Sequence, residues 1–140
     1  MKIALGSDDK TPLTDAVAED LAQRGHDVVL VGPPAGEEVE WAAVGRRVGE
    51  MVATHDVDTA VLFCWTGTGA SIAANKVRGA RAALCTDAAT AAGARKWNDA
   101  NVLVMSLRLT SPTLAAEMLD AWFSEKLDPS EAENIALLEK

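Results

Sequence analysis

The sequence predicts a single α/β domain of three layers, in which helices cover both faces of a doubly wound, mainly parallel sheet of five strands. Two observations predict this fold. Short apolar runs alternate with segments of helical periodicity along the 140 residues, which is the pattern of βαβ units. The run "DTAVLFCW" at 58–65 is apolar after its first two residues, as expected of a strand covered on both faces. No repeat, low-complexity tract or linker divides residues 1–140, so we expect one domain.

The expected strands are the apolar runs at 2–7, 26–32, 58–65, 81–86 and 101–106. The helix between the first two strands has clear boundary residues. Thr11 suits the N-cap, Pro12 suits the first helical position, and Gly25 follows the end.

Apolar residues at helical spacing predict a second helix over 40–55, after a Pro/Gly loop at 31–38. One side of this helix carries Trp41, Val44, Val48 and Met51 or Val52. Further helices are expected from about Ala70, from Ala88, and from Ser111 or Pro112 to about Lys126. The tail, residues 127–140, is predicted to form a separate terminal helix.

The composition favours a small-molecule partner over a nucleic acid or a membrane. A net charge of -8 opposes binding to a polyanion. No apolar run reaches the length of a membrane span, and the first residues lack the pattern of a secretory leader, so we expect a cytoplasmic location. Two cysteines do not make a disulfide framework, and we expect both to be free thiols.

Three predicted strand ends carry polar or reactive side chains, and ligands of such sheets bind at the carboxyl ends of strands. The first strand ends in Ser7-Asp8-Asp9, the third in Cys64-Trp65-Thr66-Gly67-Thr68-Gly69, and the fourth in Cys85-Thr86-Asp87. Cys85 has apolar neighbours in the sequence, and we expect it in the core.

The glycine turn after Cys64 has the chemistry of an anion site. Glycines bring backbone N–H groups close to a ligand, and a helix N-terminus adds a partial positive charge. A ligand oxygen that becomes negative would therefore be stabilised by the segment from Trp65 to Ala70. The same field favours the thiolate of Cys64, which would serve as a base for a carbon next to a carbonyl, or as a nucleophile. The alternative is that Cys64 is an ordinary core residue.

Three stretches, "KIALGSDD", "CWTGTGASIAANKVRGARAALC" and "WNDANVLVMSLRL", together resemble the ribose-5-phosphate isomerase B family, which includes the galactose-6-phosphate isomerase subunits. The resemblance runs from Met1 to about Phe123. It implies a Rossmann-like sheet and a homodimer, in some members paired into a tetramer, with sites built from both subunits and the tail packed on the partner. It also implies aldose–ketose isomerisation through an enediol, without a metal or another cofactor.

The resemblance also assigns roles to residues of this chain. Cys64 falls on the base that moves a proton between C1 and C2, and Thr66 on a threonine that assists at the substrate hydroxyls. Asp8 falls on an aspartate near the ring oxygen, and Asn98 on an asparagine that holds the sugar. Gly67 and Gly69 fall on the anion-hole turn, and Thr68 and Ala70 of the same segment are also expected to bind the substrate.

The chain departs from this family where the family binds phosphate and opens the sugar ring. Asp9 stands where a phosphate-binding histidine is usual, and Trp97 where a ring-opening histidine is usual. An arginine-rich tail motif is replaced by residues that include Ser130, Glu131 and Ile135. A carboxylate in place of a cation both removes an attraction for a dianion and adds a repulsion. Asp9 remains a candidate general acid or base in place of the lost histidine.

Three tryptophans stand at positions that the family places at or near its pocket: Trp41, Trp65 and Trp97. Aromatic faces suit the apolar C–H faces of sugars or a flat or cationic ligand. The alternative is that these side chains fill the core and a dimer interface.

Three interpretations follow. The first is a sugar-phosphate isomerase that binds phosphate through other cations, such as Lys10, Arg95 or Lys96. The second is an isomerase with a changed substrate, either unphosphorylated or open-chain. The third is a catalytically silent protein that binds a sugar or another ligand on the same dimeric scaffold. The retained Cys64 and Thr66 favour an isomerase that acts on a small sugar or sugar phosphate.

Overall fold

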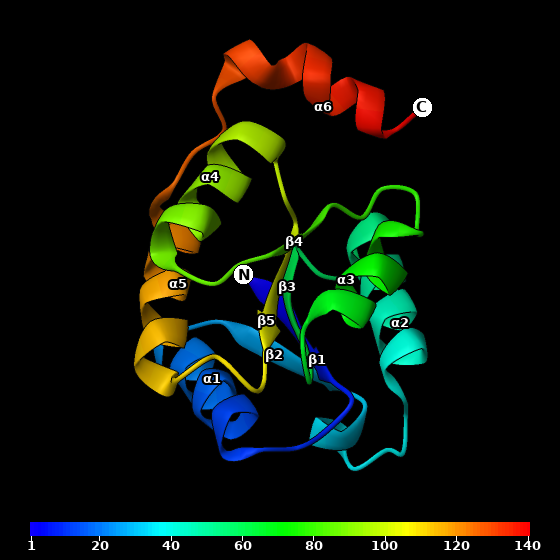
Figure 1. Cartoon of the computed structure of the whole chain (residues 1–140), viewed down its shortest axis with the longest axis vertical. Helices are drawn as coiled ribbons and strands as arrows, with labels where there is room; N and C mark the ends of the chain where they lie inside the picture. Colours follow the sequence, from blue (N-terminus) through cyan, green and yellow to red (C-terminus); the bar gives the residue numbers. More distant parts are fainter.

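A five-stranded sheet lies between two layers of helices in the computed structural model, which describes residues 1–140 (Figure 1). Its strands are β1 (Lys2–Ser7), β2 (Asp27–Val31), β3 (Thr59–Cys64), β4 (Ala82–Leu84) and β5 (Val102–Ser106). Their order in the sheet is β2-β1-β3-β5-β4. Every neighbouring pair is parallel, so the predicted sheet is confirmed and no antiparallel strand is added to it.

The helices divide between the two faces, and each face has its own apolar core. One face is covered by α1 (Pro12–Gln23), α4 (Ala88–Asn98) and α5 (Pro112–Ser124), and the other by α2 (Trp41–Ala53) and α3 (Thr68–Asn75). Successive residues of β3 alternate between the cores, with Phe63 among the first group and Leu62 and Cys64 among the second. Because side chains of a strand point alternately to the two faces of the sheet, and helices cover both faces, all six residues of β3 are buried.

The predicted start of α1 is confirmed by a reciprocal capping arrangement. The Thr11 Oγ1 atom accepts from the Thr14 backbone N–H, and the Thr14 hydroxyl oxygen accepts from the Thr11 N–H. The predicted start of α3 near Ala70 is wrong by two residues, because the helix begins at Thr68. Gly67 turns the chain with φ +81° and allows the helix to begin at the next residue.

The tail forms η2 (Pro129–Glu131), a single 3₁₀ turn, and then α6 (Ala132–Leu138), which confirms the terminal helix. Another such turn, η1 (Pro33–Ala35), lies in the predicted loop before α2. Figure 1 shows α6 at one end of the molecule, beyond the last turn of α4. Its end is held by Glu139, whose carboxylate accepts hydrogen bonds from the Gly79 backbone N–H at 3.0 Å and from Arg81 at 2.8 Å. The side chains of Leu137 and Leu138 stay exposed. No helix in the structure has the length and apolar character that a membrane crossing requires.

Truncation of Phe63 should be the more damaging of two matched changes. Phe63 is fully buried between the sheet and its helices, so Phe63→Ala should lower the free energy of unfolding by about 3–5 kcal/mol. Leu109→Ala removes a side chain that is 62% exposed, and should change it by less than about 0.5 kcal/mol. Urea unfolding followed by circular dichroism measures both. Equal losses would contradict the core assignment.

Candidate active site

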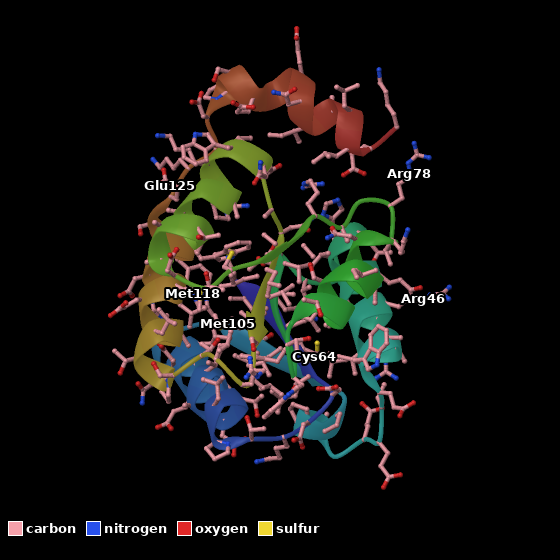
Figure 2. All side chains as sticks on the ribbon, in the orientation of Figure 1. Arg46, Cys64, Arg78, Met105, Met118 and Glu125 are labelled. Atoms are coloured by element: carbon pink, nitrogen blue, oxygen red, sulfur yellow. The ribbon has the colours of Figure 1, made fainter.

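The candidate site lies where the strand order changes direction. From β1 the sheet grows through β2 to one side and through β3 and β5 to the other, and ligands of doubly wound sheets bind at the carboxyl ends of the strands at this point. Ser7 and Phe63 are partners in the last pair of the β1–β3 ladder. The residues that follow them, Asp8 and Cys64, face one hollow of about 300 Å³. Figure 2 shows Cys64 between this end of β3 and the start of α3.

The hollow joins most of the predicted site residues. Its lining consists of Asp8, Trp41, Cys64, Trp65, Thr66, Thr68 and Gly69. Cys64 is 4% exposed, so its side chain meets solvent only through this opening. The Thr66 and Thr68 hydroxyl oxygens lie 2.8 Å apart in a hydrogen bond. The first turn of α3 begins here, and the first N–H groups of a helix have no partner within the helix.

The turn from β3 into α3 is fixed by the end of β5. The backbone N–H groups of Leu107 and Arg108 donate to the carbonyls of Cys64 and Trp65 at 3.0 and 3.1 Å. The Ser106 hydroxyl donates to the Trp65 carbonyl at 2.9 Å. These bonds occupy carbonyls of the turn, so they hold Cys64 in place without using the N–H groups of α3.

The two acidic residues after β1 have different environments. Asp8 lines the hollow, and partial burial is the main reason that its pKa is raised from the ordinary value of 3.8. The negative charge of Asp9 adds to this rise, while a hydrogen bond from the Asp8 backbone opposes it. Asp9 is exposed and does not line the hollow, and its N–H donates to the Ser7 hydroxyl at 3.2 Å. Asp8 is therefore the carboxyl group beside the thiol.

Cys85 lies in the core, as predicted. It is 1% exposed, and burial raises the pKa of its thiol to about 11. Its Sγ atom lies 3.5 Å from the Ala83 carbonyl oxygen. Both cysteines are free. No group of three or more His, Cys, Asp and Glu side chains is placed to hold a metal ion.

Trp97 and Asn98 lie apart from Cys64 within the single chain. They end α4 and precede the start of β5 at Val102. They therefore lie towards the amino ends of the strands, whereas Cys64 lies at the carboxyl end of β3. Both line a second hollow of about 580 Å³ between α4 and β4. Trp97 is 52% exposed, and its ring lies against Gly93, one helical turn earlier.

The chain has both sequence and structural similarity to known isomerases. A family model described as Ribose/Galactose Isomerase matches residues 3–137. Ribose-5-phosphate isomerase B of Escherichia coli is 35% identical over 128 residues, 91% of this chain and 86% of that protein. D-erythrulose-4-phosphate isomerase of Pectobacterium atrosepticum is 33% identical over 130 residues, 91% of this chain and 86% of that protein. The solved structure of ribose-5-phosphate isomerase B from Clostridium thermocellum is 35% identical and has a TM-score of 0.92, covering 99% of this chain and 95% of that one.

The chain belongs to the ribose/galactose isomerase family. These three relatives are named as isomerases, and this chain is an isomerase of the aldose–ketose type. The two structures share one fold over nearly the whole chain.

Arg108 is a cation near the Cys64 turn that the sequence alone did not single out. It follows β5, the strand beside β3, and its backbone N–H binds the turn next to Cys64. Its guanidinium is exposed and forms no ion pair. Of the cations considered from the sequence, Lys10 pairs with Asp15 at 2.7 Å and Arg95 with Asp99 at 3.4 Å. The sequence does show a cation two residues after the predicted strand at 101–106. Its nearness to Cys64 follows only from the strand order, in which β5 is the neighbour of β3.

Replacing Asp8 should stabilise the folded protein at neutral pH. Because its pKa is raised on folding, the folded protein binds this proton more tightly than the unfolded chain does, and ionised Asp8 costs stability at neutral pH. Asp8→Asn should therefore raise the urea midpoint at about pH 7. The gain should shrink towards about pH 3, where the wild-type carboxyl group is protonated in both states. A gain that is the same at both pH values would contradict this origin.

Proposed function

We propose that Cys64 is the base that moves the proton between C1 and C2 of a small sugar phosphate. The observation that carries this proposal is the shared hollow of the Cys64 thiol, the Asp8 carboxyl group and the first turn of α3. A base, a second proton-transfer group and a positive helix end are the three components that an enediol mechanism requires. A ligand-binding protein without catalysis has no need of this combination.

The chemistry would proceed in two proton transfers. In the aldose-to-ketose direction, the Cys64 thiolate removes the proton from C2, and the electron pair of the broken C–H bond forms the C1–C2 double bond. The carbonyl oxygen on C1 becomes negative and is stabilised by the N–H groups at the start of α3. The thiol then returns a proton to C1. Asp8 and Thr66 are the residues proposed to move the hydroxyl protons, because both line the same hollow.

Arg108 is proposed as a phosphate ligand. A phosphate dianion needs a cation, and Arg108 is an exposed and unpaired one beside the turn. Relatives that are named for D-erythrulose-4-phosphate, ribose-5-phosphate and galactose-6-phosphate support a sugar phosphate of four to six carbons. This favours the first of the three interpretations, with Arg108 as the cation in place of those considered from the sequence.

A second copy of the chain is proposed to complete the site with Trp97 and Asn98. Neither residue reaches the Cys64 hollow of its own chain, and Trp97 is half exposed. The neighbouring β4 is a short edge strand whose residues are all partly exposed. The exposed leucines of α6 would contribute apolar surface near this end of the molecule. A homodimer would cover these features and bring the two halves of the site together.

The proposal is tested by NMR assays of isomerisation with tetroses, pentoses and hexoses, each free and phosphorylated. Cys64→Ala should lower kcat by about 10²–10⁴-fold, the range of general acid–base catalysis. Cys85→Ala removes the core thiol and serves as the matched control, with kcat expected to stay at the wild-type level. Arg108→Ala should raise KM for the phosphorylated sugar only.

Sedimentation velocity on each variant establishes whether the protein is dimeric. Full activity of the Cys64→Ala variant would refute the proposed base. No turnover of any sugar by a folded wild-type dimer would favour the silent binding protein instead.

A further inference from the structure

Trp41 forms one wall of the Cys64 hollow and lies directly on the first turn of α3. A methyl group added to Gly69 would come within 2.7 Å of Cε3 and 3.0 Å of Cζ3 of the indole. The six-membered part of the ring therefore covers the Gly69 backbone where any side chain would collide with it. Trp41 is 48% exposed and lines the hollow together with Cys64 and Asp8, so one part of its surface is open to a ligand.

The packing of α2 against α3 fixes the place of this wall. Trp41, Gly45 and Gly49 are spaced four residues apart and lie on one side of α2. A methyl group on Gly45 would come within 2.8 Å of both the Ala70 carbonyl oxygen and the Ala73 Cβ. The two helices therefore touch through their backbones, and this contact seats Trp41, one turn earlier, on Gly69.

The other wall of the hollow is less constrained. Trp65 is 64% exposed, although its backbone carbonyl is held by β5. Arg108 also lies on the β5 side of the turn, whereas α2 covers the β1 side through contacts such as those near Gly6. Trp41 thus lies on the α2 side of the hollow, and the backbone of Arg108 lies on the β5 side of the turn.

We propose that Trp41 closes the hollow beyond C1, so that C1 must be the end of the carbon chain in the aldose and in the 2-ketose alike. This inference rests on the proposed function. With the developing oxyanion at the start of α3, a group attached to C1 would meet the indole that lies on Gly69. The rest of the sugar then extends the other way, towards Arg108. Trp41 is thus a specificity-determining residue, while Gly45 is a positioning residue that acts through it.

The test compares a 2-ketose phosphate substrate with its homologue that carries one extra methyl group on C1. Binding is measured by calorimetry in the Cys64→Ala background, so that no turnover is needed. The homologue should bind at least about ten-fold more weakly than the parent compound, the lower end of the discrimination that one methylene gives. In Cys64→Ala/Trp41→Ala the two compounds should bind alike.

Two further variants distinguish the loss of the Trp41 wall from a general disturbance of the site. Trp65→Ala, in the same background, should keep the discrimination. Gly45→Ala forces α2 away from α3 and should reduce it without altering any residue of the hollow. Three results would overturn the inference. They are discrimination that persists in Cys64→Ala/Trp41→Ala, equal binding of both compounds to Cys64→Ala, and binding of neither compound to Cys64→Ala. The proposed function fails separately, if wild-type protein binds the parent ketose phosphate but does not isomerise it.

Discussion

The turn between β3 and α3 is the constraint on which the site depends. Gly67 has φ +81°, and a methyl group there would lie 2.5 Å from Leu84 Cδ1 and 3.3 Å from the Met105 backbone. A side chain at this position would therefore strain the backbone, displace the end of the Leu84 side chain and press on the Met105 backbone. Because β5 in turn binds the carbonyls of Cys64 and Trp65, one residue without a side chain allows strand, helix and thiol to meet.

Close backbone contact also determines the shape of the hollow. The glycines of α2 bring it against α3, and the same packing brings Trp41 onto the start of α3. The large aromatic side chain is accommodated because Gly69 leaves room for it. The proposed base and the wall of the pocket are therefore supported by a strand and by packed helices, which is how a site maintains the geometry needed for proton transfer.

The sequence was sufficient for the architecture because its local signals agree with one another. Alternating apolar runs, the helix start at Thr11 and Pro12, and a β3 that is apolar after Thr59 each point to the same α/β architecture. The start of α3 was misjudged because glycines read as turn residues, whereas only Gly67 has the left-handed conformation and Gly69 is helical. Arg108 was missed because its place beside Cys64 depends on β5 being the neighbour of β3, which spacing does not specify. Trp97 and Asn98 were assigned by resemblance, and one chain does not bring them to the thiol.

Hydrogen exchange at the substrate carbon tests the role of Cys64 most directly. The protein is incubated in D₂O with ribose-5-phosphate and, separately, erythrulose-4-phosphate, and proton NMR follows the C1 and C2 signals. A thiol base that exchanges with solvent predicts deuterium at C2 of the aldose or C1 of the ketose with wild-type protein, and none with a folded Cys64→Ala variant. Deuterium entering at the wild-type rate in that variant would show that another group removes the proton, and would contradict the role of Cys64 as the base.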